Sequence, residues 1–274
     1  MKPLIRKIQT SLPLFLKTGC VICSLILAVF LIIHIFFPTA PAAVSTFITT
    51  HTTGLLSSER KLPIYCVNTD KPQVSLSFDA AWGNEDTDIL LNILDKYNVK
   101  TTFFMTGGWI ESYPDDVKKI AAAGHDLGNH SENHKQMSQL SAEECTNEIL
   151  TPHEEIKALT GTDMILFRPP YGDYNNTLIE AANNAGYHVI QWSVDSLDWK
   201  DYGADNIVDT VLNHQALEDG AIILMHNGDK YTKDALERVI TGLQDKGFEI
   251  VPVSQLIYTG KYHMDHTGKQ FSDE

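Results

Sequence analysis

The chain has 274 residues, of which 43% are hydrophobic, and this supplies one sizeable core but is thin for two. Its 35 acidic residues outnumber 21 basic ones, so nucleic acid and anionic lipid are poor partners for its surface. Two of the four cysteines lie in an apolar run, which leaves too few for a disulfide scaffold. Cys66 and Cys145 are therefore expected to be free thiols, in preference to one bridge between them.

The first 43 residues predict a membrane anchor. Residues 19–37 are apolar apart from His34, and about 20 such residues suffice to cross a bilayer as a helix. Four basic residues precede this run and none follows it closely, which predicts a cytoplasmic N-terminus and an exported remainder. We therefore expect a single-pass protein of the cell membrane. The small residues at 38–43 leave open the alternative of signal cleavage and secretion.

The rest of the chain predicts one domain. Residues 44–61 are rich in Ser and Thr and indicate a linker, the domain is expected over 62–260, and a flexible tail over 261–274. Short apolar runs alternate with amphipathic segments, at 74–78, 100–105, 125–129, 164–167, 187–194, 220–225 and 248–253. This alternation is typical of repeated βα units. Seven runs in a domain of this size predict an α/β fold, a distorted or incomplete (β/α) barrel with about seven parallel strands.

Ionisable side chains end five of the seven runs: Asp79, His130, Arg168, Asp195 and His226. In a βα barrel the reactive groups gather at the C-terminal ends of the strands, because the βα loops converge on that face. We therefore expect these five side chains to share one cleft.

The sequence HSENH at 130–134 brings two histidines together. If the strand continues straight into a helix, His130 and His134 lie one turn apart on the same face, and both imidazoles can hold one metal ion. Taken alone, the pair is also explained as surface or capping histidines, but the other strand ends favour the metal. A zinc-protease HExxH motif is excluded, because Ser131 stands where that motif needs Glu.

The sequence RPPYG at 168–172 is expected to hold two side chains rigidly at the mouth of the barrel. Its prolines fix the exit from the strand and Gly172 permits a tight turn, which places Arg168 and Tyr171. An ordinary Pro-rich turn is the alternative. Asp79, at the same face of the barrel, offers Arg168 a partner.

The sequence DSLDW at 195–199 adds two carboxylates and an indole to the same cleft. One carboxylate can orient a neighbouring histidine and raise its pKa, and capping of the following helix is the structural alternative for the other. Trp199 offers an apolar face on which a sugar ring can stack. His226 follows the apolar run 221–225, so a buried core histidine is the alternative to a residue of the cleft.

These five segments, in this order and at these strand ends, resemble the motifs of the NodB-homology polysaccharide deacetylases, carbohydrate esterase family 4. The segments are SFDAAWG, HSENH, RPPYG, DSLDW and the LMH that ends on His226. The resemblance covers about residues 62–258, and HSENH with RPPYG is its most specific part. It implies metal-dependent removal of N-acetyl groups from a glycan polymer, either peptidoglycan or a chitin-like chain.

The resemblance also implies roles for the residues at the metal and the base. Asp79 would be the general base, held in place by Arg168. His130 and His134 would bind a divalent metal, with zinc expected and cobalt or another transition metal as alternatives.

The remaining roles belong to the acid and to the substrate groove. His226 would be the general acid, and Asp198 would raise its pKa. Tyr171 and Trp199 would contact the substrate.

One residue departs from the family pattern. The family has a second Asp directly after the base, where it binds the metal, and this chain has Ala80. A two-histidine site without that carboxylate should hold its metal less tightly. Asp86, Glu85 and Asp173 are candidates for a replacement ligand, and spacing selects none of them. The loss leaves open a catalytically weak or silent glycan-binding protein, whereas the retained acid and base favour an enzyme.

Overall fold

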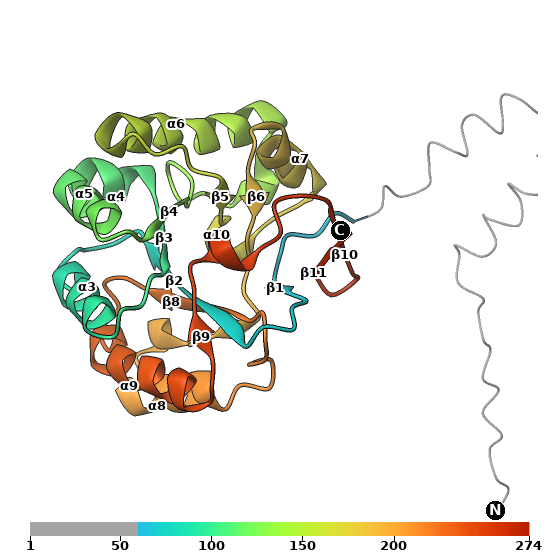
Figure 1. The fold of residues 1–274 in the computed structure, drawn as a ribbon. Helices are drawn as coiled ribbons and strands as arrows, with labels where there is room; N and C mark the ends of the chain where they lie inside the picture. The colour runs from blue at the N-terminus through green and yellow to red at the C-terminus, as the bar shows by residue number, and fades with distance from the viewer. Residues whose placement is uncertain (1–59, 274) are drawn as a thin grey trace, which may run out of the picture. The chain divides into compact units, whose positions relative to one another are not determined.

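A sheet of seven parallel strands organises residues 60–273, the part of the chain that the computed structural model describes (Figure 1). In chain order the strands are β2 (Gln73–Ala80), β3 (Thr102–Met105), β4 (Asp126–Asn129), β5 (Leu166–Phe167), β6 (His188–Val189), β7 (Val194–Asp195) and β8 (Ile222–His226). Along the sheet they run β6-β5-β4-β3-β2-β8-β7, and a further strand, β9 (Glu249–Ile250), pairs with the start of β2. The expected distorted or incomplete barrel is confirmed.

Most helices lie around the outside of the sheet (Figure 1). These outer helices are α3 (Thr87–Lys96), α4 (Gly107–Ser112), α5 (Pro114–Ala122), α6 (Ala142–Thr160), α7 (Asn176–Asn184), α8 (Ala204–Leu212) and α9 (Thr232–Asp245). The short α10 (Val253–Leu256) belongs instead to a second apolar cluster, which contains Phe104, Leu166 and Ile222. The sequences of the outer helices explain their packing: in α9, Leu236, Val239 and Leu243 recur at helical spacing and all are buried. Helix α6 begins at a capping box, in which Ser141 and Glu144 satisfy each other's backbone N–H groups.

The alternation of side chains in β2 aims the catalytic candidate into the barrel. Leu76 and Phe78 belong to the apolar core that also includes the buried faces of the helices. Ser77 and Asp79 point to the opposite face, where both accept hydrogen bonds from Arg168. Asp79 lies one residue before the C-terminal end of the strand, so it is at the mouth of the barrel.

The apolar run 187–194 was expected to be one strand, and this is wrong. It contains β6 and β7, which are consecutive in the chain but form the two ends of the sheet. Between them Gln191 donates its N–H to Ile64 O at 2.7 Å, and Ser193 donates to Ile222 O at 3.0 Å. The run therefore crosses the opening between the two ends of the sheet.

The flexible tail expected over 261–274 is also wrong. Strands β10 (Tyr262–Met264) and β11 (Lys269–Ser272) form an antiparallel hairpin, and β11 pairs with β1 (Cys66–Val67). Gln270 is fully buried, and its side chain exchanges hydrogen bonds with both the N–H and the C=O of Tyr258. Polar residues in this segment thus satisfy backbone groups of the domain.

The expected membrane anchor at 19–37 lies outside the described residues, as does the linker over 44–61 except for Arg60 and Lys61. Among residues 60–273 no helix is long and apolar enough to cross a bilayer. The two cysteines of this part, Cys66 and Cys145, are free thiols, as expected.

Gly220 provides a test of the packing between β1 and the turn that precedes β8. Its φ is +86°, and an added Cβ would lie 1.8 Å from Val67 O. We expect Gly220→Ala to cost at least about 2 kcal/mol of unfolding free energy. Gly186→Ala is the matched control, because Gly186 also has a positive φ, +83°, but its Cβ would meet open space. Thermal unfolding of both variants measures the difference, and equal losses would contradict the close approach.

Candidate active site

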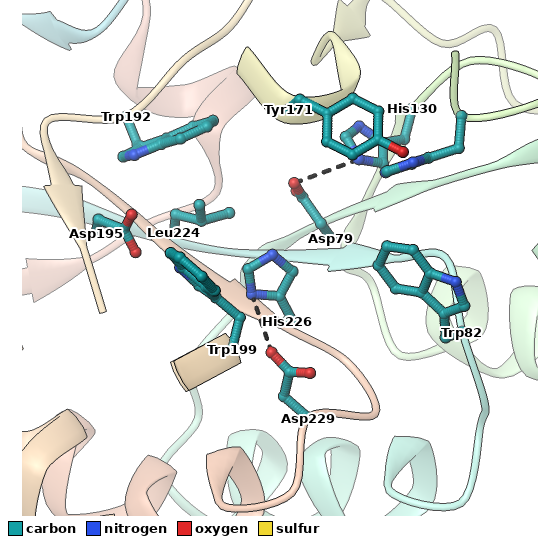
Figure 2. A pocket seen from close by; sticks show the side chains of 11 residues that line it. Asp79, Trp82, His130, Tyr171, Trp192, Asp195, Trp199, Leu224, His226 and Asp229 are labelled. Atoms are coloured by element: carbon teal, nitrogen blue, oxygen red, sulfur yellow. Dashed lines mark ion pairs between the residues drawn. The ribbon is translucent and has the colours of Figure 1, made fainter. Parts of the chain in front are cut away.

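A pocket of about 480 Å³ opens at the C-terminal ends of the strands (Figure 2). It is lined by Asp79, Trp82, His130, His134, Tyr171, Trp192, Asp195, Trp199, Leu224, His226 and Asp229. Six of the eight predicted site residues are in this lining. The other two, Arg168 and Asp198, are fully buried and bond to the lining residues Asp79 and His226.

A buried ion pair holds Asp79. Arg168 donates from Nη1 to Asp79 Oδ1 at 2.7 Å and from Nη2 to Ser77 Oγ at 2.8 Å, and its guanidinium lies 4.1 Å from the centroid of the Phe104 ring. Burial alone would raise the pKa of Asp79, but the charge and hydrogen bond of Arg168, together with His130 and His226, outweigh burial and hold the pKa below its usual range. Asp79 is therefore an oriented carboxylate at neutral pH.

A second carboxylate holds His226. This residue ends β8 and pairs in register with Asp79 on β2, so the two side chains start from neighbouring backbone positions. Asp198 Oδ1 accepts from His226 Nδ1 at 2.8 Å, and Asp198 Oδ2 accepts from His226 N and Thr232 Oγ1, both at 2.7 Å. Burial alone would lower the pKa of His226, but the hydrogen bond and charge of Asp198, with the charges of Asp79 and Asp229, raise it to about 9. His226 is thus a proton donor at neutral pH, with Nε2 left for the pocket.

The segment HSENH is a loop, so the helical geometry expected for it is wrong. Ser131 and His134 have positive φ values of 67° and 51°, which a helix does not allow. The N–H of Ser131 bonds to Asn129 Oδ1 at 2.9 Å, and the N–H of His134 bonds to Ser131 Oγ at 3.0 Å. The two imidazoles still meet, with ring centroids of His130 and His134 5.0 Å apart.

Glu148 of α6 fixes the middle of this loop. Its buried carboxylate accepts from the N–H of Asn133 at 2.8 Å and from Asn133 Nδ2 at 2.9 Å, and it pairs with Lys135 Nζ at 2.7 Å. All three bonds tie residues on either side of His134 to one helix. Sequence reasoning missed Glu148, because nothing along the chain relates α6 to the loop before it.

Both histidines are in the form that binds a metal. Arg168 O can only accept, so its 2.7 Å contact assigns the proton of His130 to Nδ1 and leaves the Nε2 lone pair free. Nε2 lies 3.5 Å from Asp79 Oδ2. Burial lowers the pKa of His130, and it lowers that of His134 to about 4, so both rings are neutral. This donor set fits a divalent transition metal held by His130 and His134.

None of the expected replacement carboxylates lines the pocket. Asp86 pairs with Lys233 at 2.7 Å, Asp173 accepts from Ser138 N at 2.8 Å, and Glu85 accepts from Asn84 N at 3.1 Å. The methyl group of Ala80 is fully buried in the apolar core. Of the carboxylates in the lining, Asp79 is the one that contacts His130.

A cluster of possible ligands elsewhere in the pocket is better explained as a proton-holding group. Ligand atoms of Asp198, His226 and Asp229 lie within 4.8 Å of one another. Both oxygens of Asp198 already accept hydrogen bonds, including one from Trp199 N at 3.0 Å. A cation would have to displace these donors. Asp229 Oδ2 lies 3.4 Å from His226 Nδ1 and adds negative charge beside the imidazolium.

Two aromatic residues occupy the positions expected for substrate contacts. Tyr171 and Trp199 are exposed at the pocket, and the Tyr171 ring lies edge-on to His134 with centroids 4.6 Å apart. Trp82, Trp192, Leu224 and Asp229 also line the pocket and were not predicted. Trp82 could have been predicted from its position in SFDAAWG, because it lies two residues after the end of β2.

Comparison with known proteins agrees with this site. A family model for polysaccharide deacetylases matches residues 67–190. YlxY of Bacillus subtilis is 37% identical over 202 residues, which cover 74% of this chain and 62% of YlxY, so the chain spans less than two thirds of that relative. A peptidoglycan-N-acetylglucosamine deacetylase of Bacillus cereus is 34% identical over 196 residues, which cover 70% of each protein.

Solved structures include an inactive relative. BA3943 of Bacillus anthracis, a family 4 pseudoenzyme, superposes with a TM-score of 0.68 and 34% identity, covering 71% of this chain and 68% of that one. A mutant of BA3943 with restored enzymatic activity has the same TM-score and identity, covering 71% and 70%. The chain belongs to the polysaccharide deacetylase family, carbohydrate esterase family 4.

Glu148 provides a test of how the loop is held. We expect Glu148→Gln to lower the affinity for zinc by about tenfold, because partners that orient metal ligands contribute about 10- to 100-fold. His130→Ala and His134→Ala should remove most bound zinc while the barrel stays folded. Glu144→Gln on the same helix is the matched control, since Glu144 bonds to Ser141 and not to the loop. Calorimetric titration measures all four; equal affinities for Glu148→Gln and the unmodified protein would contradict the positioning role.

Proposed function

We propose that this protein hydrolyses the N-acetyl amide of amino sugars in a cell-wall glycan, with peptidoglycan as the substrate and zinc as the metal. The observation that carries the proposal is the pairing of an oriented base with a charged acid: Asp79 and His226 face one pocket from register-paired positions of adjacent strands. Relatives that act on peptidoglycan support the choice of glycan over a chitin-like chain. An anchor at 19–37 would hold the domain outside the cell membrane, where this polymer lies.

The residues divide the reaction between them. A divalent metal held by His130 and His134 supplies a Lewis acid for the acetamide carbonyl. Asp79 takes a proton from the attacking water as its oxygen bonds to the carbonyl carbon. His226 gives its Nε2 proton to the sugar nitrogen as the C–N bond breaks, so acetate and a free amine leave.

Two buried partners keep these groups in the right protonation states. Arg168 keeps Asp79 ionised and aims one oxygen at the pocket. Asp198 stabilises the imidazolium of His226 and fixes the ring by its Nδ1.

The second candidate is a catalytically weak or silent glycan-binding protein. Ala80 favours it, since the family's metal-binding carboxylate is lost, and so does the similarity to a pseudoenzyme. The retained Asp79, Arg168 and His226 favour the enzyme, because a protein that only binds glycan has no evident use for an acid and a base.

The pH dependence of activity tests the role of His226. With a pKa near 9, His226 is protonated and competent below that pH, so acetate release should fall as the pH rises through about 9. Asp198→Asn removes the negative charge that helps to raise this pKa, and the alkaline limb should move to lower pH. Asp195→Asn is the matched control in the same pocket, because Asp195 bonds to Leu197 N and not to His226. A limb unchanged in Asp198→Asn would rule out His226 as the acid.

Ala80→Asp separates the two candidate functions. We expect the full-length protein to release acetate from N-acetylated peptidoglycan with added zinc or cobalt, and Ala80→Asp to bind zinc about tenfold more tightly, as a charged oxygen ligand does. Acetate from the variant alone would identify the silent binder. Acetate from neither protein under any metal would contradict the deacetylase.

Thermal unfolding shows where the new carboxylate goes. Because the methyl group of Ala80 is buried, an unpaired Asp there should destabilise the protein without zinc, and zinc should restore the loss. A loss that zinc does not restore, with no gain in zinc affinity, would place residue 80 in the core and outside the metal site.

A further inference from the structure

Trp82 is an exposed indole that the mechanism above does not use. It lies in the loop between β2 and α3, 64% of its surface is accessible, and it lines the pocket. Large apolar side chains left in water at a functional cleft are typical of binding surfaces. The exposure of Trp82 at the pocket therefore indicates that a ligand covers the indole when it binds.

Contacts hold the chain at Trp82 and at the two residues that follow it. Trp109 Nε1 donates to Gly83 O at 2.6 Å, and Asn84 Nδ2 donates to Asp116 Oδ2 at 2.6 Å. Gly228 packs so closely that an added Cβ would lie 2.6 Å from Trp82 O. The backbone of the loop therefore has little conformational entropy left to lose when a ligand binds to the indole.

The indole also has a defined orientation in the pocket. Its ring is tilted by 67° from that of His134, with centroids 5.0 Å apart, so the two rings are not stacked and most of the indole surface stays accessible. Figure 2 shows Trp82 on the opposite side of His226 from Trp199. The acid therefore lies between two exposed indoles.

The charges of the pocket select the class of occupant. Asp79, Asp195 and Asp229 line it, and the protein carries a net charge of −14, so an anionic ligand is disfavoured. A neutral sugar ring has an apolar face of C–H groups that stacks on an indole. The sugar that reacts must lie at Asp79 and His226, which leaves Trp82 for a different ring.

We propose that Trp82 is a stacking site for a second sugar of the N-acetylated glycan, adjacent to the sugar that reacts. The inference rests on the proposed function. Such a site makes the protein selective for glycan chains over single sugars. One indole then serves the neighbouring unit while the acid and base act on the first.

Binding of β-1,4-linked N-acetylglucosamine oligomers of one to five units tests the proposal. NMR titration of the full-length protein with EDTA present measures affinity without hydrolysis. Trp82→Ala should weaken binding of the longer oligomers by about tenfold and leave binding of the monosaccharide unchanged. Trp82→Phe should keep most of the affinity. Tyr202→Ala is the matched control, because Tyr202 is 65% exposed but does not line the pocket.

The outcomes distinguish this site from the proposed function. Equal affinity of Trp82→Ala and the unmodified protein for the pentamer would overturn the stacking site, whether or not acetate is released. Chain-length-dependent binding that Trp82→Ala abolishes would support it, even if the protein releases no acetate. Zinc affinity is measured in parallel: a loss in Trp82→Ala that matches the loss of glycan affinity would mean that Trp82 acts through His134, and would also overturn the proposal.

Discussion

The buried ion pair between Arg168 and Asp79 is the interaction on which the rest of the site depends. Taking two charges out of water is costly, and hydrogen bonds to the remaining donors of a buried pair offset part of that cost. Here Arg168 Nη2 also bonds to Ser77 Oγ and to Gln191 O, and the guanidinium lies over Phe104, while its buried Nε has no hydrogen-bond partner. One guanidinium therefore joins β2 and the end of β5 to the segment beyond β6. Loss of either charge would leave the other buried and unpaired.

The same pair organises the electrostatics of the pocket. Arg168 keeps Asp79 ionised, and its backbone carbonyl assigns the proton of His130 to Nδ1. On the other side Asp198 keeps His226 protonated. The states of the base and the acid depend mainly on the buried Arg168 and Asp198, whereas the two imidazoles are neutral because they are buried.

The sequence predicted the barrel and the members of the site because strand ends in a βα fold share one face. It did not predict the geometry of HSENH, because the left-handed backbone at Ser131 and His134 depends on Asn129 and on a glutamate from α6. It also joined β6 and β7 into one strand, since a continuous apolar run does not reveal that it changes neighbours at Gln191. The pattern of the sequence was therefore sufficient to predict which residues share the site. Their backbone geometry and the pairing of the strands depend on tertiary contacts that the pattern does not contain.

The crossing from β6 to β7 has a consequence for the motion of the barrel. In register, β6 pairs with β5 through two residues, and β7 pairs with β8 through two, whereas β2 pairs with β8 through five. Segments with few backbone hydrogen bonds open at low free energy, so this seam between β6 and β7 should open more easily than the central pair of β2 and β8. Trp192 and Asp195, both in the pocket wall, belong to the seam. The crossing from β6 to β7 can therefore exchange its amide hydrogens while β2 and β8 stay paired. Its opening would change the width of the pocket that is available to a polymer at this wall.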